Sequence, residues 1–201
     1  NNVFKKYSHE MAWCVQHEWN INEKVKLDIG FRLSYFHHTG PYQENYGTDT
    51  IKYAKGKGIK PYVGAEPRIA MRYNLDKFSS LKAGLSFNYQ YIHLVSNSNS
   101  TLPTDVWVQS SANVKPQQAL QLSVGYFRNF KDNMFETSVE VYYKHLFNQI
   151  EYSEYYVNEL NQDPEKSYVF GTGKAYGAEF FIRKNKGKLN GWIGYTISRS
   201  D

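Results

Sequence analysis

The sequence lacks the features that define several common protein classes. It contains one cysteine, Cys14, in 201 residues, so an internal disulfide is excluded. No apolar run approaches the roughly 18 residues that predict a membrane-spanning helix. The excess of cations is small: 24 Lys and Arg against 19 Asp and Glu give a net charge of +5. These cations form no basic cluster, and a nucleic-acid partner is therefore not expected.

Motifs for catalysis or metal binding are also scarce. The six histidines are scattered and none has the spacing of a structural zinc site, so neither a metal nor another cofactor is expected. Gly171 and Gly173 lack the remaining positions of a phosphate-binding loop. Glu140 and Glu179 are conceivable as a glycosidase pair, but isolated carboxylates are ordinary on a wet strand face. The sequence therefore predicts a protein that is not an enzyme.

Aromatic residues, in contrast, are abundant. They make up 17% of the chain, with 18 Tyr, 12 Phe and 4 Trp, although the mean hydropathy of −0.65 is that of a polar protein. A soluble protein seldom combines so many rings with so little overall hydrophobicity. A membrane β-barrel does, because half of each strand faces water and aromatic rings gather at the two membrane interfaces.

The clearest periodicity is an alternation of apolar and polar residues. In segment 24–36 the apolar register consists of Val25, Leu27, Ile29, Phe31, Leu33 and Tyr35. Successive side chains of a strand point to opposite faces, so one face of this strand is continuous hydrocarbon. The same pattern predicts strands over 9–19, 61–73, 81–91, 118–128, 135–147, 176–183 and 189–197. In 81–91 the apolar register ends with Tyr89 and Tyr91.

The opposite register carries charges that the core of a β-sandwich could not hold. They are Asp28, Arg32, Glu66, Arg68, Arg72, Glu140, Glu179 and Arg183. A wet barrel lumen or a solvated outer face accommodates them. Pro67 falls in the apolar register of segment 61–73 and cannot donate a ladder hydrogen bond. We therefore expect a β-bulge or a local break in the sheet there.

The connections between the predicted strands alternate in length. Short ones fall at 20–24, 74–80, 129–133 and 185–188, and long ones at 38–59, 97–116 and 152–174. Short periplasmic turns and long extracellular loops are typical of outer-membrane barrels. The fold class predicted is thus all-β, a segment of an antiparallel up-and-down transmembrane β-barrel with about eight strands in four hairpins. Strand 24–36 then runs outward and strand 61–73 inward.

The long loops contain the candidate ligand contacts. Aromatic rings with polar neighbours suit stacking on a sugar, a peptide or a ring system, and a single Trp stands in the polar loop 97–116. The candidates are Tyr42, Tyr46, Asn99, Asp105 and Trp107. The alternative is that these aromatic residues pack the loops against one another and against the end of the barrel, as loops of this length usually require.

Several motifs resemble the barrel of TonB-dependent outer-membrane receptors. The resemblance covers most of residues 8–200, in the order of the family, and includes segments 64–75, 90–127, 139–152 and 175–200. The most specific parts are LPTDVW at 102–107 and the hairpin YGAEFFIRK…GWIGYTISRS at 176–200. They are most similar to the branch whose full chains carry an N-terminal carboxypeptidase-regulatory-like domain.

This resemblance implies a larger assembly. Receptors of the family are barrels of about 22 strands that are filled by a plug domain. They import scarce nutrients across the outer membrane of Gram-negative bacteria with energy relayed by the TonB complex. Residues 1–201 are then expected to form a partial barrel domain, with the plug domain and the TonB box outside this chain. Outer-membrane lipid, the protein's own plug domain and the TonB complex are the partners implied, and a surface lipoprotein is a further candidate.

Two alternatives remain open at this stage. One is a complete small eight-stranded outer-membrane barrel with a structural or adhesive role, which the strand count fits. The other is a soluble secreted β-protein that binds carbohydrate, against which the charged register and the alternating loop lengths argue. The sequence does not identify the cargo, because siderophore, haem, cobalamin, glycan and peptide receptors share this type of wall.

The two registers of segment 24–36 lead to a first prediction. In the full-length barrel, Ile29→Arg should destabilise the fold by about 2–4 kcal/mol, because it places a charge in the lipid midplane. Ser34→Arg, in the polar register, should be much milder. Folding titrations in lipid vesicles measure both free energies, and equal values would refute the assignment of the faces.

Overall fold

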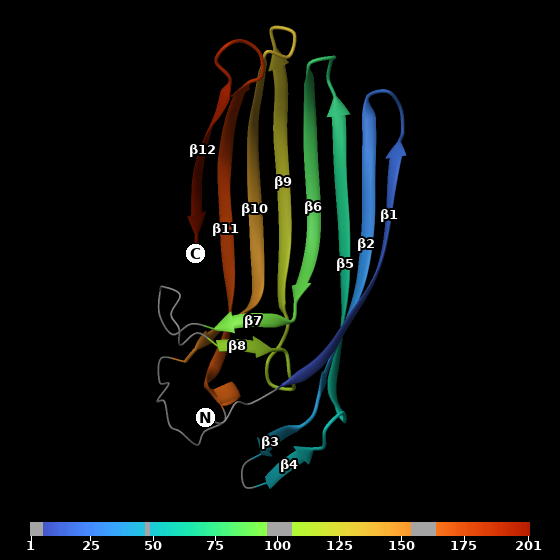
Figure 1. Cartoon of the computed structure of the whole chain (residues 1–201), viewed down its shortest axis with the longest axis vertical. Helices are drawn as coiled ribbons and strands as arrows, with labels where there is room; N and C mark the ends of the chain where they lie inside the picture. Colours follow the sequence, from blue (N-terminus) through green and yellow to red (C-terminus); the bar gives the residue numbers. More distant parts are fainter. Residues whose placement is uncertain (1–5, 47–48, 96–105, 154–163) are drawn as a thin grey trace.

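A computed structural model describes residues 6–46, 49–95, 106–153 and 164–201. Eight of its strands form one antiparallel sheet in which each strand lies beside its neighbour in sequence (Figure 1). This order is up-and-down, as predicted, and β1 and β12 are the two edges of the open sheet. The strands are β1 (Tyr7–Asn20), β2 (Val25–Thr39), β5 (Gly58–Asn74), β6 (Ser79–Gln90), β9 (Gln117–Phe130), β10 (Phe135–Tyr152), β11 (Tyr168–Lys184) and β12 (Gly191–Ser200).

Two small hairpins and one short helix lie between the main strands. The hairpins are β3 (Tyr42–Tyr46) with β4 (Asp49–Tyr53), and β7 (Ile92–Val95) with β8 (Val106–Gln109), and the 3-10 helix η1 spans Pro164–Ser167. Of these elements, β3, β4, β8 and the helix fall where the sequence predicted loops, and β7 falls just before the predicted loop 97–116. We call the end of the sheet that carries these elements the rim. Figure 1 shows it opposite the end formed by the short turns. Within the described residues, no helix is long and apolar enough to span a membrane.

Side-chain oxygens shape two of the short turns. Asn22 Oδ1 accepts hydrogen bonds from the backbone N–H groups of Lys24 and Val25, both at 2.9 Å. Asp76 Oδ1 accepts from the N–H groups of Phe78 and Ser79 at 2.7 and 2.9 Å, and Asp76 Oδ2 accepts from the Ser79 hydroxyl at 2.6 Å. Asn and Asp favour tight turns for this reason, since their short side chains replace missing backbone partners.

The predicted alternation places two different surfaces on the two faces of the sheet. One row of directly paired residues crosses six strands and consists of Ile29, Ile69, Leu85, Leu122, Tyr143 and Tyr176. Ile29, Ile69 and Leu122 are 42–44% exposed in the chain on its own. We call this surface, which a single soluble sheet would not leave uncovered, the apolar face.

A row one residue further along the strands contains no large apolar side chain. It consists of Gln16, Gly30, Arg68, Ser86, Gln121, Lys144, Ala175 and Ser200. Because side chains alternate with period two, this row lies on the other side of the sheet, which we call the polar face. The chain therefore separates an apolar and a polar surface by the thickness of one sheet.

The break expected at Pro67 is confirmed on one side of its strand. β5 pairs with β6 only from Arg68 to Asn74, although both strands are described throughout and continue further toward the rim. On the other side, the pairing of β5 with β2 runs through Pro67 without a bulge. Pro61 and Pro67 are six residues apart, so their nitrogens point toward the same neighbour. Neither nitrogen carries a hydrogen to donate, which explains why the ladder toward β6 ends there while the ladder with β2 continues.

Two residues near this break differ from the sequence prediction. Tyr91 was expected to continue the apolar register, but β6 ends at Gln90 and the Tyr91 ring stacks on Phe36, a polar-register residue, at 5.0 Å between centroids. Ser34 is completely buried beneath the Tyr91 hydroxyl. Ser34→Arg is therefore not a mild substitution, and Gln121, which is exposed on the polar face, is the suitable position for comparison with Ile29→Arg.

The Asp76 turn leads to a prediction about pH. The hydrogen bond from the Ser79 side chain, followed by that from the Phe78 backbone, lowers the pKa of Asp76. A carboxyl group whose pKa is lower in the folded state stabilises the fold above its unfolded pKa and loses this effect as the pH falls through the folded pKa. Asp76→Ala should therefore destabilise the barrel at neutral pH, and the difference from wild type should vanish in acid. Unfolding titrations across this pH range test this, with Lys77→Ala as the control that should show no such dependence.

Candidate functional site: the polar face and the rim

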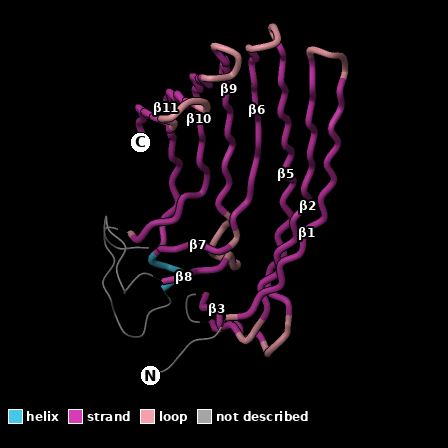
Figure 2. The backbone as a smooth tube through the Cα atoms, turned by 45° about the horizontal axis from the view of Figure 1, so that its top comes forward, coloured by secondary structure: helices cyan, strands magenta, loops and turns pink. Residues whose placement is uncertain are grey.

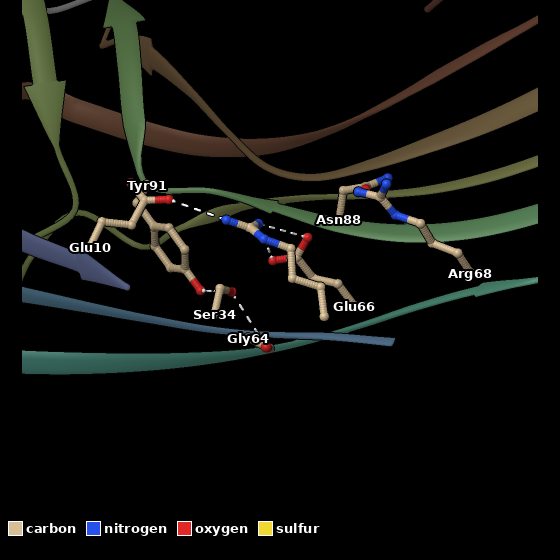
Figure 3. A network of polar contacts seen from close by, with 8 residues as sticks. Glu10, Ser34, Gly64, Glu66, Arg68, Asn88 and Tyr91 are labelled. Carbon is tan, nitrogen blue, oxygen red and sulfur yellow. Dashed lines mark hydrogen bonds and ion pairs between the residues drawn. The ribbon is translucent and has the colours of Figure 1, made fainter. Parts of the chain in front are cut away.

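A bidentate polar contact on the polar face joins Arg32 to the buried carboxylate of Glu66. These residues are directly paired between β2 and β5, and Arg32 Nη1 donates to both carboxylate oxygens of Glu66 at 2.8 and 3.1 Å (Figure 3). Arg32 Nη2 lies 3.6 Å from Glu10 Oε1 in β1. The Glu66 side chain is only 1% exposed. A charge so buried needs a partner, and the guanidinium supplies a charge-assisted one.

The other charges in this half of the polar face also find partners. Arg68 Nη2 donates to Asn88 Oδ1 at 3.0 Å, across the point where the β5–β6 ladder has ended. The Gln16 amide donates to both oxygens of Asp28 at 2.8 and 3.0 Å. Arg72 Nε donates to Asn74 Oδ1 at 2.9 Å. Five of the predicted polar-register charges, namely Asp28, Arg32, Glu66, Arg68 and Arg72, therefore each have a hydrogen-bond partner, and Arg32 and Glu66 are the two that pair opposite charges.

The row that contains Glu140 and Glu179 is arranged differently. Across the sheet it consists of Lys26, Arg72, Lys82, Gly125, Glu140, Glu179 and Thr196. Like charges therefore lie directly opposite each other, both in the cationic part and in the acidic part, an arrangement that destabilises a sheet. Among the described residues, Glu140 and Glu179 form no side-chain hydrogen bond or ion pair, whereas Glu136 lies directly opposite Arg183.

At the rim, a second buried cluster holds segments that are far apart in sequence. Val95, Val108, Val114 and Tyr168 form a small hydrophobic core, with Ile150 and Tyr152 packed against it. Beside it, Glu165 is 4% exposed and accepts hydrogen bonds from Lys6 Nζ at 2.6 Å and from Ser111 Oγ at 2.5 Å. This core accounts for Val108, Val114, Tyr152 and Tyr168 among the apolar and aromatic residues of the long connections.

The buried imidazole of His93 belongs to the same region. His93 in β7 is completely buried, and its Nε2 lies 3.2 Å from Ser110 Oγ. Burial lowers the pKa of His93, and a hydrogen bond with Gln117 opposes that effect. The neutral form is thus favoured. Within the described residues, no group of three or more His, Cys, Asp and Glu side chains is placed to hold a metal ion.

The predicted ligand contacts do not converge on one element. Trp107 is in β8, directly opposite Leu94, and is 68% exposed. Tyr42 and Tyr46 are in β3, which with β4 forms a separate small sheet. Figure 2 also shows β3 and β8 as separate parts of the rim. Asn99 and Asp105 lie outside the described residues.

Sequence reasoning did not identify several residues of these sites. Lys6 and Glu165 are 159 positions apart, and no local pattern connects them. Glu10 falls within the predicted strand 9–19 and Ser111 within the predicted loop 97–116, but no sequence pattern indicated a partner for either residue. Their partners depend on strand register and on the path of the rim connections, which period-two alternation does not contain.

An open antiparallel sheet with an exposed apolar face and a charged opposite face is the wall of a membrane β-barrel. The chain belongs to the TonB-dependent receptor family, since residues 3–201 match the family model described as "TonB dependent receptor-like, beta-barrel". The resemblance drawn from the sequence motifs is thereby confirmed. Members of this family are receptors, and their solved relatives are outer-membrane proteins.

Solved structures show the same fold. The match to the FrpB iron transporter from Neisseria meningitidis (F3-3 variant) covers 98% of this chain and 27% of the FrpB chain, with a TM-score of 0.63 and 13% sequence identity. The match to the alcaligin outer-membrane receptor FauA from Bordetella pertussis covers 96% of this chain and 30% of the FauA chain, with a TM-score of 0.63 and 12% sequence identity. The match to the pyoverdine receptor FpvA from Pseudomonas aeruginosa PAO1 covers 96% of this chain and 25% of the FpvA chain, with a TM-score of 0.62 and 19% sequence identity. The chain thus spans less than a third of these proteins. No curated protein matches its sequence.

The Arg32–Glu66 pair leads to a third prediction. Arg32→Met leaves the buried Glu66 carboxylate without its main partner and should destabilise the fold by about 2 kcal/mol, less than for a fully buried pair because Arg32 is one-third exposed. Arg68→Met is the matched control. Arg68 is exposed and its partner is neutral, so the expected change is below about 1 kcal/mol. Urea unfolding in vesicles compares the two variants, and equal destabilisation would contradict the ranking.

Proposed function

We propose that this chain is part of the barrel wall of a TonB-dependent transporter that imports a scarce nutrient across the outer membrane of a Gram-negative bacterium. The observation that carries the proposal is the exposed apolar row across six neighbouring strands, in a chain that matches the family over residues 3–201. In this arrangement the apolar face contacts lipid, the rim lies outside the cell and the short turns face the periplasm. The chain itself carries out no catalysis.

Other parts of the protein would complete the transporter. The solved relatives are more than three times as long as the region they share with this chain. We assign residues 1–201 to a partial barrel domain and place the plug domain and the TonB box elsewhere in the protein. The TonB complex would then act through that other part, and a surface lipoprotein is a candidate partner at the rim.

The polar face would line the lumen and contact the plug. Glu140 and Glu179 repel each other across β10 and β11, and the paired cations Arg72 and Lys82 do the same across β5 and β6. A plug surface with cations opposite the glutamates and carboxylates opposite Arg72 and Lys82 would relieve both repulsions. The Arg32–Glu66 pair would instead stiffen the wall, because each of these two charges already has an oppositely charged partner.

The ligand would bind at the rim. Trp107, the one candidate whose side chain is described, is 68% exposed, and Tyr42, Tyr46, Asn99 and Asp105 complete the proposed set. An iron–siderophore complex is the first ligand class to test, since the names of the three solved relatives refer to iron, alcaligin and pyoverdine. Glycans, peptides and cobalamin follow.

Uptake by the full-length protein tests this function. A strain that lacks the gene should lose uptake of one nutrient from a labelled panel, regain it from a plasmid, and lose it again without TonB. Trp107→Ala should reduce uptake while the protein still migrates as a folded barrel in heat-modifiability gels. Uptake unaffected by TonB would refute the transporter and favour a structural or adhesive barrel. Unchanged uptake by Trp107→Ala would remove only that residue from the ligand site.

The glutamate pair provides a fourth prediction. Replacing Glu140 and Glu179 together by Gln removes their mutual repulsion but also the negative charge proposed to hold the plug. The full-length protein should remain a folded barrel but admit a large hydrophilic antibiotic several-fold faster, because the plug is held less firmly. Glu136→Gln is the control, since Glu136 already lies opposite Arg183. Equal permeability of the three proteins would contradict the proposed contact.

A further inference from the structure

The wall contains one line along which the backbone ladder is replaced by side-chain contacts. β5 and β6 are hydrogen bonded over seven residue pairs, from Arg68–Ser86 to Asn74–Ser80. Seven residues of strand are about 24 Å long, which at the usual strand tilt of about 35–45° covers roughly 17–20 Å of the apolar band of about 25 Å in an outer-membrane barrel. Beyond Arg68 the two strands continue toward the rim without pairing, over the stretch of β5 that contains Pro61 and Pro67. We call this unpaired part of the β5–β6 boundary the seam.

The position of the seam can be compared with the apolar band. Unpaired backbone groups are very unfavourable in hydrocarbon but are readily solvated in water. The ladder covers most of the band, and the seam begins near its outer edge at Pro67, which has no N–H to leave unpaired. The prolines also keep a foreign strand from pairing with the β5 edge, because they present no N–H there. The seam is therefore unsuited to receive an added strand.

One aromatic side chain closes the seam on the polar face. Tyr91, which follows β6, stacks on Phe36 of β2 with an interplanar angle of 5°, and its hydroxyl is hydrogen bonded to Ser34 Oγ at 2.8 Å (Figure 3). Gly64 of β5 leaves room for this contact. A Cβ at position 64 would lie 2.5 Å from the Tyr91 hydroxyl and 2.6 Å from Ser34 Oγ. Only glycine at that position lets Tyr91 reach across.

Three more side-chain contacts join the two parts of the wall. Arg68 donates to Asn88 at the end of the seam that adjoins the ladder. Further toward the rim, the Tyr62 hydroxyl of β5 donates to the Ser111 carbonyl at 2.7 Å. Ser111 Oγ donates in turn to Glu165, which also binds Lys6 just before β1. The strands β1, β2 and β5 are thus connected to β6 and its successors at this level by contacts that can break one at a time.

We propose that the seam is an opening joint of the barrel wall. The parts of β5 and β6 near the rim separate when Tyr91 leaves Phe36 and Ser34, while the ladder from Arg68 to Asn74 stays closed. Opening widens the mouth between β5 and β6 while the ladder from Arg68 to Asn74 stays paired within the apolar band. The contacts of Tyr62, Ser111 and Glu165 limit how far the two parts move. This motion is a property of the wall and does not depend on which solute the protein carries.

Pulsed electron-spin distance measurements on the full-length protein in lipid vesicles test the proposal. With Cys14 replaced by serine, spin labels at Val63 and Leu120 report across the seam. Labels at Met71 and Val124 form the matched control, because these residues are joined through Ala83 by an unbroken ladder. Tyr91→Ala removes the closing ring, and Gly64→Ala forces it away. Each should lengthen the Val63–Leu120 distance by roughly one strand spacing, about 5 Å, and leave the control distance unchanged.

A milder variant provides a further check. Tyr91→Phe keeps the stacked ring and loses only the hydroxyl bond, so it should shift the Val63–Leu120 distance in the same direction but less. It also keeps the test decisive if the alanine variants do not reach the heat-modifiable folded state. An unchanged seam distance in every folded variant would overturn the proposal. Equal changes at the seam and at the control pair would also overturn it, because they would indicate general loosening of the sheet.

Discussion

The rest of this structure depends on one requirement, that backbone N–H and C=O groups inside a membrane find partners within the protein. Strands meet it only by pairing with neighbours on both sides. Pairing fixes the side chains in alternation, and alternation produces both surfaces of the wall. The row through Ile29 and Ile69 faces one way and the row through Arg68 and Gln121 the other, although the rows are one residue apart. A slip of one residue in any strand would exchange the two surfaces.

The same requirement explains where the wall departs from regularity. Pro67 cannot donate a hydrogen bond, so it is tolerated only where the ladder is dispensable. The ladder between β5 and β6 ends beside this residue, after a paired stretch that covers most of the apolar band once the strand tilt is included. Side chains replace the backbone from there on, and each of these contacts is weaker and more easily exchanged than a run of ladder bonds. A proline in one strand thus divides a rigid part of the wall from a part that can move.

The charges of the polar face follow a related logic. Arg32, Glu66 and Asp28 are satisfied within the sheet, which suits a stiff wall. Glu140 and Glu179 are placed where the sheet itself leaves them unsatisfied. In the proposed function, the groups that complete such surfaces belong to other parts of the receptor, in keeping with a chain that covers less than a third of its solved relatives. The charges without partners in the sheet therefore indicate where the proposed plug would contact the wall. The charges that already have partners indicate where such a contact is not required.

The sequence by itself determined the eight strands, their up-and-down order, the two faces, the alternation of short and long connections and the break at Pro67. All of these follow from period-two alternation and from the chemistry of single residues, which are local properties. Only the tertiary structure decided that Tyr91 crosses to the polar face, that Ser34 is buried beneath it, and that Glu165 binds Lys6 from 159 positions away. It also revealed the two rim hairpins. These features depend on how strand register brings distant segments together, and such long-range contacts leave no periodic trace in the chain.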